Sequence, residues 1–143
     1  MAESEHRTIS GHFEELTPEH CAELLGTTTV GRVVFAGEQQ IEILPVNFVY
    51  RDGAVLFRTS PFGALARLAT GVDGVAFEAD YHDDLTQSGW SVVVRGRVEA
   101  VEGSAELTEL WSQVRPSPWA AGVRTLFLRL EPRSLTGRSV RRA

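Results

Sequence analysis

The chain has 143 residues, 43% of them hydrophobic and 23% charged, which is the size and balance of one globular domain. All 14 basic residues are arginine, against 19 acidic residues, and the lack of lysine excludes Schiff-base chemistry and the phosphate-binding lysine of a P-loop. The single cysteine, Cys21, excludes an internal disulfide and paired-cysteine zinc sites. The chain has no apolar run of membrane-spanning length, and its first residues are polar and acidic. We therefore expect a cytoplasmic protein without membrane contact.

The first predicted elements are a flexible segment and a short helix. Residues 1–16 are mostly polar and charged without an apolar period, so we expect them to be flexible and to precede one folded domain over residues 17–143. Thr17 and Pro18 are typical of a helix N-terminus, and Gly26 ends the apolar stripe that follows.

A period of two then predicts three strands, over residues 28–36, 40–50 and 54–60. The clearest turn signal is Asp52-Gly53, between the second and the third strand, because glycine tolerates the positive φ of a two-residue hairpin. The three strands are therefore predicted to form an antiparallel meander.

After Pro61, apolar residues recur at helical spacing and predict a short helix that stops at Gly71. Strands resume over about 73–81 and 89–101. The second of these alternates, so one of its faces should belong to the core. That face carries Trp90, Val92, Val94, Val98 and Ala100.

The last part of the chain predicts a helix over about 105–115 and two more strands, one ended by Pro132 and a short one ending near Val140. The total is about seven strands and three short helices. Strands linked mainly as hairpins, with too few helices for a βαβ alternation, predict a mainly β fold. We expect a closed or half-closed antiparallel barrel of six to seven strands.

Most catalytic signatures are absent from the chain. It has no nucleophile elbow, no dinucleotide-binding glycine loop and no zincin helix. His82 lies among carboxylates in residues 80–84, but this spacing matches no ligand motif and favours a solvated loop. Cys21 lies in an apolar helix stripe, which favours a buried, unreactive thiol. We predict no metal site.

Polar side chains at strand ends are the remaining candidates for binding. Arg58, Thr59 and Ser60 combine a forked charged donor with two hydroxyls, which suits a phosphate. Pro45 cannot donate to a strand ladder, so it marks an edge or an opening. Ordinary strand-end residues would look the same, and the residues alone leave both interpretations open. The other members of the set are Asn47, Trp90 and Ser91.

The order of these segments resembles the pyridoxamine 5′-phosphate oxidase-like, flavin-binding split-barrel family, over about residues 17–141. The most specific segment, Trp-Ser-Val-Val-Val-Arg-Gly over residues 90–96, is similar to the actinobacterial branch of that family. The other matching segments are Gly31-Arg32-Val33, Leu44-Pro45-Val46-Asn47-Phe48, Phe57-Arg58-Thr59-Ser60-Pro61 and Thr136-Gly137-Arg138.

This resemblance implies a homodimer of split barrels with two cofactor sites between the subunits. It also implies FMN or a deazaflavin coenzyme as cofactor, and hydride transfer to or from a small organic substrate. It points to no dedicated catalytic acid or base, and Trp90 and Ser91 would reach the cofactor from the partner subunit. The residues assigned to the cofactor are Pro45, Val46 and Asn47 at the isoalloxazine ring, Arg58, Thr59 and Ser60 at the phosphate, Trp90 and Ser91 on the strand beside it, and Leu65 and Arg138.

One departure from the family concerns the phosphate. The family often has a Gly-x-Lys pattern where the next helix opens, and here that position is Ala64. Arg67 or Arg138 is a possible replacement for the missing charge. The alternative is a chain that has kept the fold and lost the cofactor.

Two other functions compete with an oxidoreductase. A non-catalytic barrel would store or sequester a flavin, a haem or a similar planar ligand without turnover. The basic end of the chain suits nucleic acid, but a net charge of −5 opposes non-specific binding, so we expect no nucleic-acid partner. The arginines concerned are Arg133, Arg138, Arg141 and Arg142.

Overall fold

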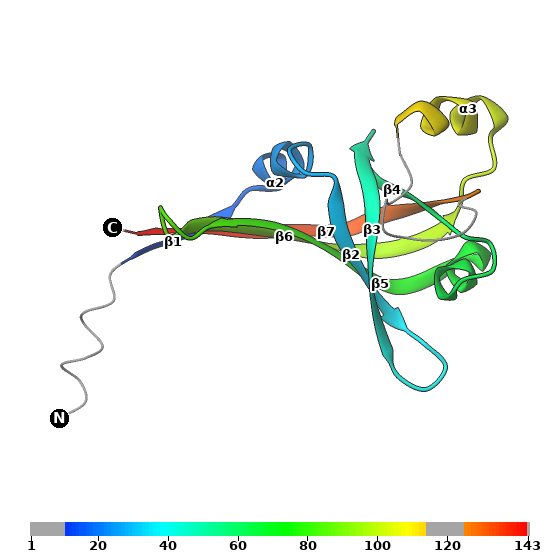
Figure 1. Ribbon diagram of the computed structural model, residues 1–143, viewed down its shortest axis with the longest axis horizontal. Coiled ribbons are helices and arrows are strands. Elements are labelled where there is room, and N and C mark those ends of the chain that lie inside the picture. The colour runs from blue at the N-terminus through cyan, green and yellow to red at the C-terminus, as the bar shows by residue number, and fades with distance from the viewer. Residues whose placement is uncertain (1–10, 114–124, 143) are drawn as a thin grey trace.

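A computed structural model describes residues 11–113 and 125–142 (Figure 1). The strands are β1 (Gly11–Leu16), β2 (Val30–Ala36), β3 (Ile41–Arg51), β4 (Ala54–Thr59), β5 (Val72–Asp83), β6 (Ser88–Ala100) and β7 (Leu126–Arg142). The helices are α2 (Pro18–Leu25), the 3-10 helix η1 (Ala64–Thr70) and α3 (Ser104–Gln113). Seven strands and three short helices in the described part of the chain confirm the predicted fold class.

The strands form one antiparallel sheet that closes on itself. Its order is β1-β7-β4-β3-β2-β5-β6, and β6 also pairs with β7, so the six strands from β7 to β6 make a barrel. The remaining strand, β1, pairs with the C-terminal half of β7 and lies along the long β6–β7 ribbon (Figure 1). Closure removes most of the free edges that a flat meander would expose.

Strand β3 changes partner halfway along its length. Residues 41–47 pair with β2, whereas residues 48–51 pair with β4 through the hairpin at Asp52-Gly53. Both turn residues have positive φ, 51° and 75°, as a type I′ turn requires, which confirms the predicted hairpin. Within the described residues, the edge of 41–47 that faces away from β2 therefore has no strand partner. This is where the barrel is split.

The core fills the barrel with side chains from alternate strand positions. Val92, Val94 and Val98 are fully buried, as the alternation of this strand predicts. The rings of Phe48 and Phe77 meet edge to face with their centroids 4.7 Å apart. The large, fully buried side chains of this core include Phe48, Phe57, Phe77, Leu128 and Leu130.

Helix α2 packs on the main core, and α3 packs on a separate cluster. Helix α2 starts where predicted, since the Thr17 hydroxyl accepts a hydrogen bond of 3.1 Å from the His20 N–H, and it packs against β7 through Cys21. Helix α3 covers a second, smaller apolar cluster that contains Leu56, Leu110 and Phe127. Its predicted end at residue 115 lies outside the described residues. No helix in the described ranges is long and apolar enough to cross a membrane.

The predicted flexible segment over residues 1–16 is wrong for residues 11–16. These residues form β1, which pairs in register with β7 from Gly11 opposite Arg142 to Leu16 opposite Gly137. Most of its side chains are exposed, so the strand has no apolar period and depends on backbone pairing with a distant part of the chain. Residues 1–10 lie outside the described part.

The predicted end of a strand at Pro132 is also wrong, because β7 continues through it to Arg142. Pro132 lies opposite Gly96, and Ser134 lies opposite Arg95, so Arg133 is an extra residue in a bulge. A bulge tolerates proline because the regular ladder of N–H donors is already interrupted there. The two predicted C-terminal strands are thus one strand that serves both β4 and β1.

Candidate functional site

The predicted ring-binding residues lie on β3, beside the split in the barrel. Pro45 and Asn47 point away from the barrel interior, since the alternate residues Val46 and Phe48 are buried inside it. Pro45 is opposite Arg32 of β2 and lies within the part of β3 whose other edge is open. The structure thus puts Pro45 at an opening, as predicted, and it makes Val46 a core residue.

The predicted phosphate-binding residues lie at the end of β4, and they divide between two faces. Arg58 points outward, with its guanidinium carbon 5.5 Å from the centre of the Phe127 ring, and partial burial lowers its pKa. Arginine remains charged despite this shift. Thr59 points into the barrel and is 4% exposed. Ser60 follows the strand, and its hydroxyl accepts a 3.1 Å hydrogen bond from the Phe62 N–H. Of the three predicted phosphate-binding residues, only Arg58 and Ser60 therefore present their side chains outside the barrel.

The helix η1, which follows β4 and Ser60, is anchored in the core. Leu65 is 4% exposed and packs into the main core, so it anchors η1 and presents no side-chain surface to a ligand from solvent. Ala64 and Arg67 are exposed on the same short helix.

The other predicted residues lie far along the β6–β7 ribbon. Ser91 of β6 is directly opposite Arg138 of β7, which is in turn opposite Glu15 of β1, so the three share the outward face. They line a shallow pocket of about 250 Å³ together with Phe13, whose ring centre is 5.8 Å from the Arg138 guanidinium carbon. Trp90, the neighbour of Ser91, points to the opposite face and packs against the core.

These two groups of residues cannot meet within one chain. Arg58 pairs with Phe127, near the start of β7, and Arg138 lies eleven residues further along the same strand. At the usual rise of a strand, this corresponds to a path of roughly 35 Å along β7. One phosphate cannot contact both arginines of a single subunit.

A cluster of charges that the sequence analysis missed lies on the outward face between the two groups. Arg32 Nη1 is 3.3 Å from Glu78 Oε1 and 3.4 Å from Asp80 Oδ1. Burial and, after it, the neighbouring Asp80 carboxylate raise the pKa of Glu78 to about 7, against the opposing effect of Arg32. The i, i+2 spacing of the two acids on one strand is the signal that could have revealed the cluster.

The outward face around this cluster is unusually apolar. Ile41 and Ile43 of β3 are 70% and 63% exposed, and Phe13 and Val140 are exposed on the ribbon. Exposed apolar side chains gathered on one sheet face are typical of a surface that another protein covers.

The shifted pKa of Glu78 gives a test by pH. A carboxyl whose folded pKa is raised favours the fold when it is protonated, so this contribution is lost as the pH rises from about 4.5 through about 7. We expect Glu78→Gln to raise the free energy of unfolding by about 1 kcal/mol at pH 8, allowing for solvent screening, and to change it little at pH 5. Urea unfolding at both pH values measures this. Glu38→Gln, in the exposed turn after β2, is the control and should follow the wild-type curve.

The alternatives considered from the sequence are not supported by the described residues. His82 Nε2 lies 3.0 Å from Asp84 Oδ1 on an exposed turn, and no group of three or more potential metal ligands occurs in residues 11–113 and 125–142. Cys21 is fully buried, and burial raises its pKa, so its thiol is a poor nucleophile.

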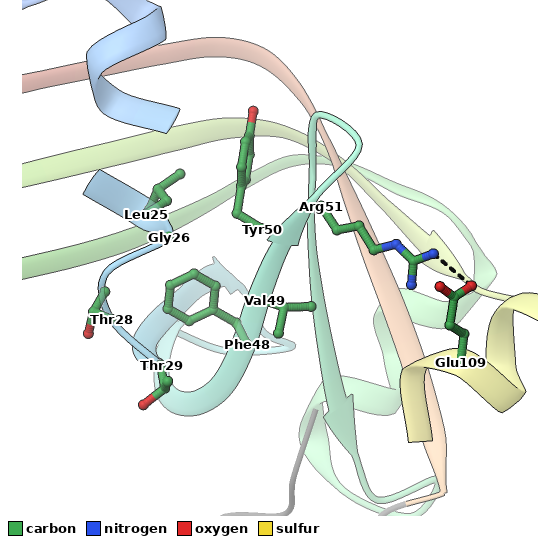
Figure 2. A pocket seen from close by; sticks show the side chains of 9 residues that line it. All are labelled: Leu25, Gly26, Thr28, Thr29, Phe48, Val49, Tyr50, Arg51 and Glu109. Atoms are coloured by element: carbon green, nitrogen blue, oxygen red, sulfur yellow. Dashed lines mark ion pairs between the residues drawn. The ribbon is translucent and has the colours of Figure 1, made fainter. Parts of the chain in front are cut away.

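A separate pocket of about 470 Å³ lies at the end of β3, between the last residues of α2 and helix α3 (Figure 2). Arg51 reaches from β3 toward α3, where its Nη2 lies 2.7 Å from Glu109 Oε2. Phe48 and Tyr50 form the part nearer α2. None of the residues predicted to bind a cofactor lines this pocket.

Comparison with known proteins finds one family and several relatives. The family model described as pyridoxamine 5′-phosphate oxidase matches residues 17–139. An uncharacterized protein of Mycobacterium tuberculosis is 31% identical over 127 residues, covering 86% of this chain and 82% of its own.

Two solved structures share the fold along nearly their whole length. The structure of the FAD binding protein from Mycobacterium smegmatis is 35% identical, with a TM-score of 0.73, and the match covers 89% of this chain and 98% of that one. An FAD-binding protein from Mesorhizobium loti has a TM-score of 0.71 over 92% of this chain and 98% of that one. Its identity of 20% shows a common fold only.

Proposed function

Since this chain belongs to the pyridoxamine 5′-phosphate oxidase family, we propose that it is a homodimeric flavin-dependent oxidoreductase with its cofactor in grooves between the subunits. The observation that carries the proposal is the separation of Arg58 from Arg138 by roughly 35 Å along β7. Residues that the resemblance assigns to one cofactor are thus too far apart in one subunit. A second copy that covers the apolar outward face brings the ribbon of one subunit to the split of the other.

The split in the barrel has features that suit a flavin. The edge of residues 41–46 that faces away from β2 offers backbone groups to the polar edge of the ring, and Pro45 adds no backbone donor that would attract another strand there. Arg58 and Ser60 would hold a phosphate with a charged donor and a hydroxyl donor. Ser91 and Arg138 of the partner subunit would complete the site. Trp90 would support their strand from the core side.

A bound flavin supplies hydride transfer, and the chain's own residues would supply binding, orientation and exclusion of water. Arg58 and Ser60 would anchor the tail, so that the ring lies against Pro45 and Asn47 at a fixed depth. The covering ribbon of the partner would then exclude solvent from the ring. The 35% identical FAD binding protein from Mycobacterium smegmatis supports a flavin over a deazaflavin coenzyme. A small organic substrate and a cytoplasmic location remain predictions.

The first experiment asks whether a flavin binds. Purified protein with excess FMN, FAD or a deazaflavin coenzyme should melt at a higher temperature than protein alone, and flavin absorbance should stay with the protein through gel filtration at the size of a dimer. If no coenzyme shifts the melting temperature, the proposal is wrong. Turnover with reduced nicotinamide and an acceptor separates an oxidoreductase from a barrel that only sequesters flavin.

The second experiment asks whether two subunits share each site. Arg58→Met and Arg138→Met should each weaken flavin binding at both sites of a homodimer by about 10-fold or more. A heterodimer of the two variants, purified through two different tags, should regain one intact site and bind one flavin. If each site lay within one subunit, both sites of the heterodimer would keep a lesion and no binding would return.

A further inference from the structure

The cluster formed by Arg32, Glu78 and Asp80 contains two acids and one cation. A single nitrogen of Arg32, Nη1, lies 3.3 Å from Glu78 Oε1 and 3.4 Å from Asp80 Oδ1. Within the described residues, the two acids form no other ion pair. One guanidinium neutralises one carboxylate, so the second carboxyl group keeps an uncompensated charge when it ionises. A single proton bound by the two acids together removes that charge.

The surroundings of the two acids favour the proton on Glu78. Its side chain is 29% exposed, against 48% for Asp80, and this burial contributes most to the raised pKa of Glu78. Two further cations lie on the same face: Arg95 of β6 is diagonal to Glu78, and Arg138 of β7 lies beyond Ser91, which is opposite Asp80. Neither forms an ion pair with the two acids in the described structure. The pair therefore holds a proton at neutral pH.

The strand register places this proton beside the proposed ring-binding segment. Pro45 of β3 is opposite Arg32 of β2, and Arg32 is opposite Glu78 of β5. All three face outward, because the residues that alternate with them on each strand are buried. Two strand spacings put the Cα atoms of Pro45 and Glu78 about 10 Å apart. The Glu78 side chain therefore borders the place proposed for the ring and the substrate.

Hydride transfer to an organic acceptor also needs a proton, because the acceptor is left with one negative charge. We infer that Glu78, held by Arg32 and Asp80, is the general acid that gives this proton to the substrate. The O–H bond of Glu78 breaks as the proton bonds to the substrate, and the resulting carboxylate takes a proton from water before the next turnover. The inference rests on the proposed function and adds an acid to which the family resemblance does not point.

The first measurement follows the Glu78 carboxyl carbon by NMR during a pH titration of the full-length protein without flavin. The carboxyl should titrate near pH 7. Asp80→Asn should lower this midpoint, because a neighbouring negative charge is lost, and Arg32→Met should raise it, because the cation that favours the carboxylate is lost. A midpoint near the ordinary glutamate value of about 4.3 would overturn the inference, since no proton would be held at neutral pH.

The second measurement follows reduction of the quinone menadione by flavin-loaded protein that has been reduced beforehand, in single turnovers without oxygen. The quinone takes a hydride at one oxygen and a proton at the other. The wild-type rate should fall above about pH 7, as Glu78 loses its proton. Glu78→Gln should lower the rate about 100-fold or more below that pH and remove the pH dependence. Asp80→Asn and Arg32→Met should move the fall in rate to lower and to higher pH, respectively.

Flavin affinity separates a proton donor from a residue that only shapes the site. Glu78→Gln should change the flavin dissociation constant less than twofold, because Glu78 is not among the residues proposed to hold the cofactor. Glu38→Gln, in the exposed turn after β2, is the matched control and should keep the wild-type rate and pH dependence.

The outcomes distinguish this inference from the proposed function. A Glu78→Gln protein with the wild-type rate and pH dependence would overturn the general acid and leave the flavin-dependent oxidoreductase standing. Weaker flavin binding in Glu78→Gln, with a rate lowered equally at every pH, would make Glu78 a structural part of the site and would also overturn it. If the wild type binds no flavin, the proposed function fails and this inference fails with it.

Discussion

Gly96→Ala should destabilise the barrel by about 3 kcal/mol, near the upper end of the usual cost of overpacking. A Cβ at this position would lie 1.9 Å from the Glu131 carbonyl oxygen and 3.1 Å from the Pro132 Cα. Both are backbone atoms in the bulge of β7, so they cannot move aside like the end of a flexible side chain. Relief requires β6 and β7 to separate where their pairing closes the barrel.

Urea unfolding followed by circular dichroism measures this effect. Gly63→Ala is the control, because a Cβ there has its nearest neighbours at 3.9 Å and the residue has a φ of −89°. The control should change the free energy of unfolding by less than about 0.5 kcal/mol. A Gly96→Ala protein as stable as the control would mean that β6 and β7 are not in contact at the bulge.

Arg58→Met should weaken flavin binding by about 10-fold to 100-fold, the usual range for loss of a charge-assisted hydrogen bond to phosphate. Methionine keeps much of the side-chain length, so the contact with Phe127 is largely retained and the fold should survive. Arg58→Lys should recover part of the affinity, since lysine restores the charge without the forked donor.

Titration with FAD and FMN measures the loss, and Arg67→Met is the matched control. Arg67 is exposed in the helix that follows and should affect affinity less than twofold if Arg58 carries the phosphate. A larger effect at Arg67 than at Arg58 would mean that the phosphate binds at the face of η1 and not at the end of β4.

The change of partner along β3 explains how a small barrel can have a binding site for a large ligand. Residues 48–51 are held by β4, and residues 41–47 are held by β2 on one edge only. An 11-residue strand paired with both neighbours along its whole length would leave no split in the barrel. The split leaves backbone groups and Asn47 beside Arg58 without opening the core, since Val46 and Phe48 remain buried.

Some of the candidate site could be predicted because it depends on short segments. The positions of Pro45, Arg58 and Ser60 at an opening and at a strand end follow from proline's missing donor and from the apolar runs beside them. Which side chains face outward could be predicted only partly. Thr59 and Val46 proved to be core residues, because strand alternation relative to a closed barrel decides the inner face.

Local elements could be predicted because residues that are close together in the chain set them: the capped start of α2, the Asp52-Gly53 hairpin and the alternation of β6. The strand at residues 11–16 and the continuation of β7 through Pro132 could not be predicted in this way, because both depend on partners far away in the sequence. The tertiary structure alone also placed Arg58 beside the start of β7 and Arg138 in the part of β7 that pairs with β1. A propensity acts over a few neighbouring residues, whereas strand register and distance are set by the whole closed sheet.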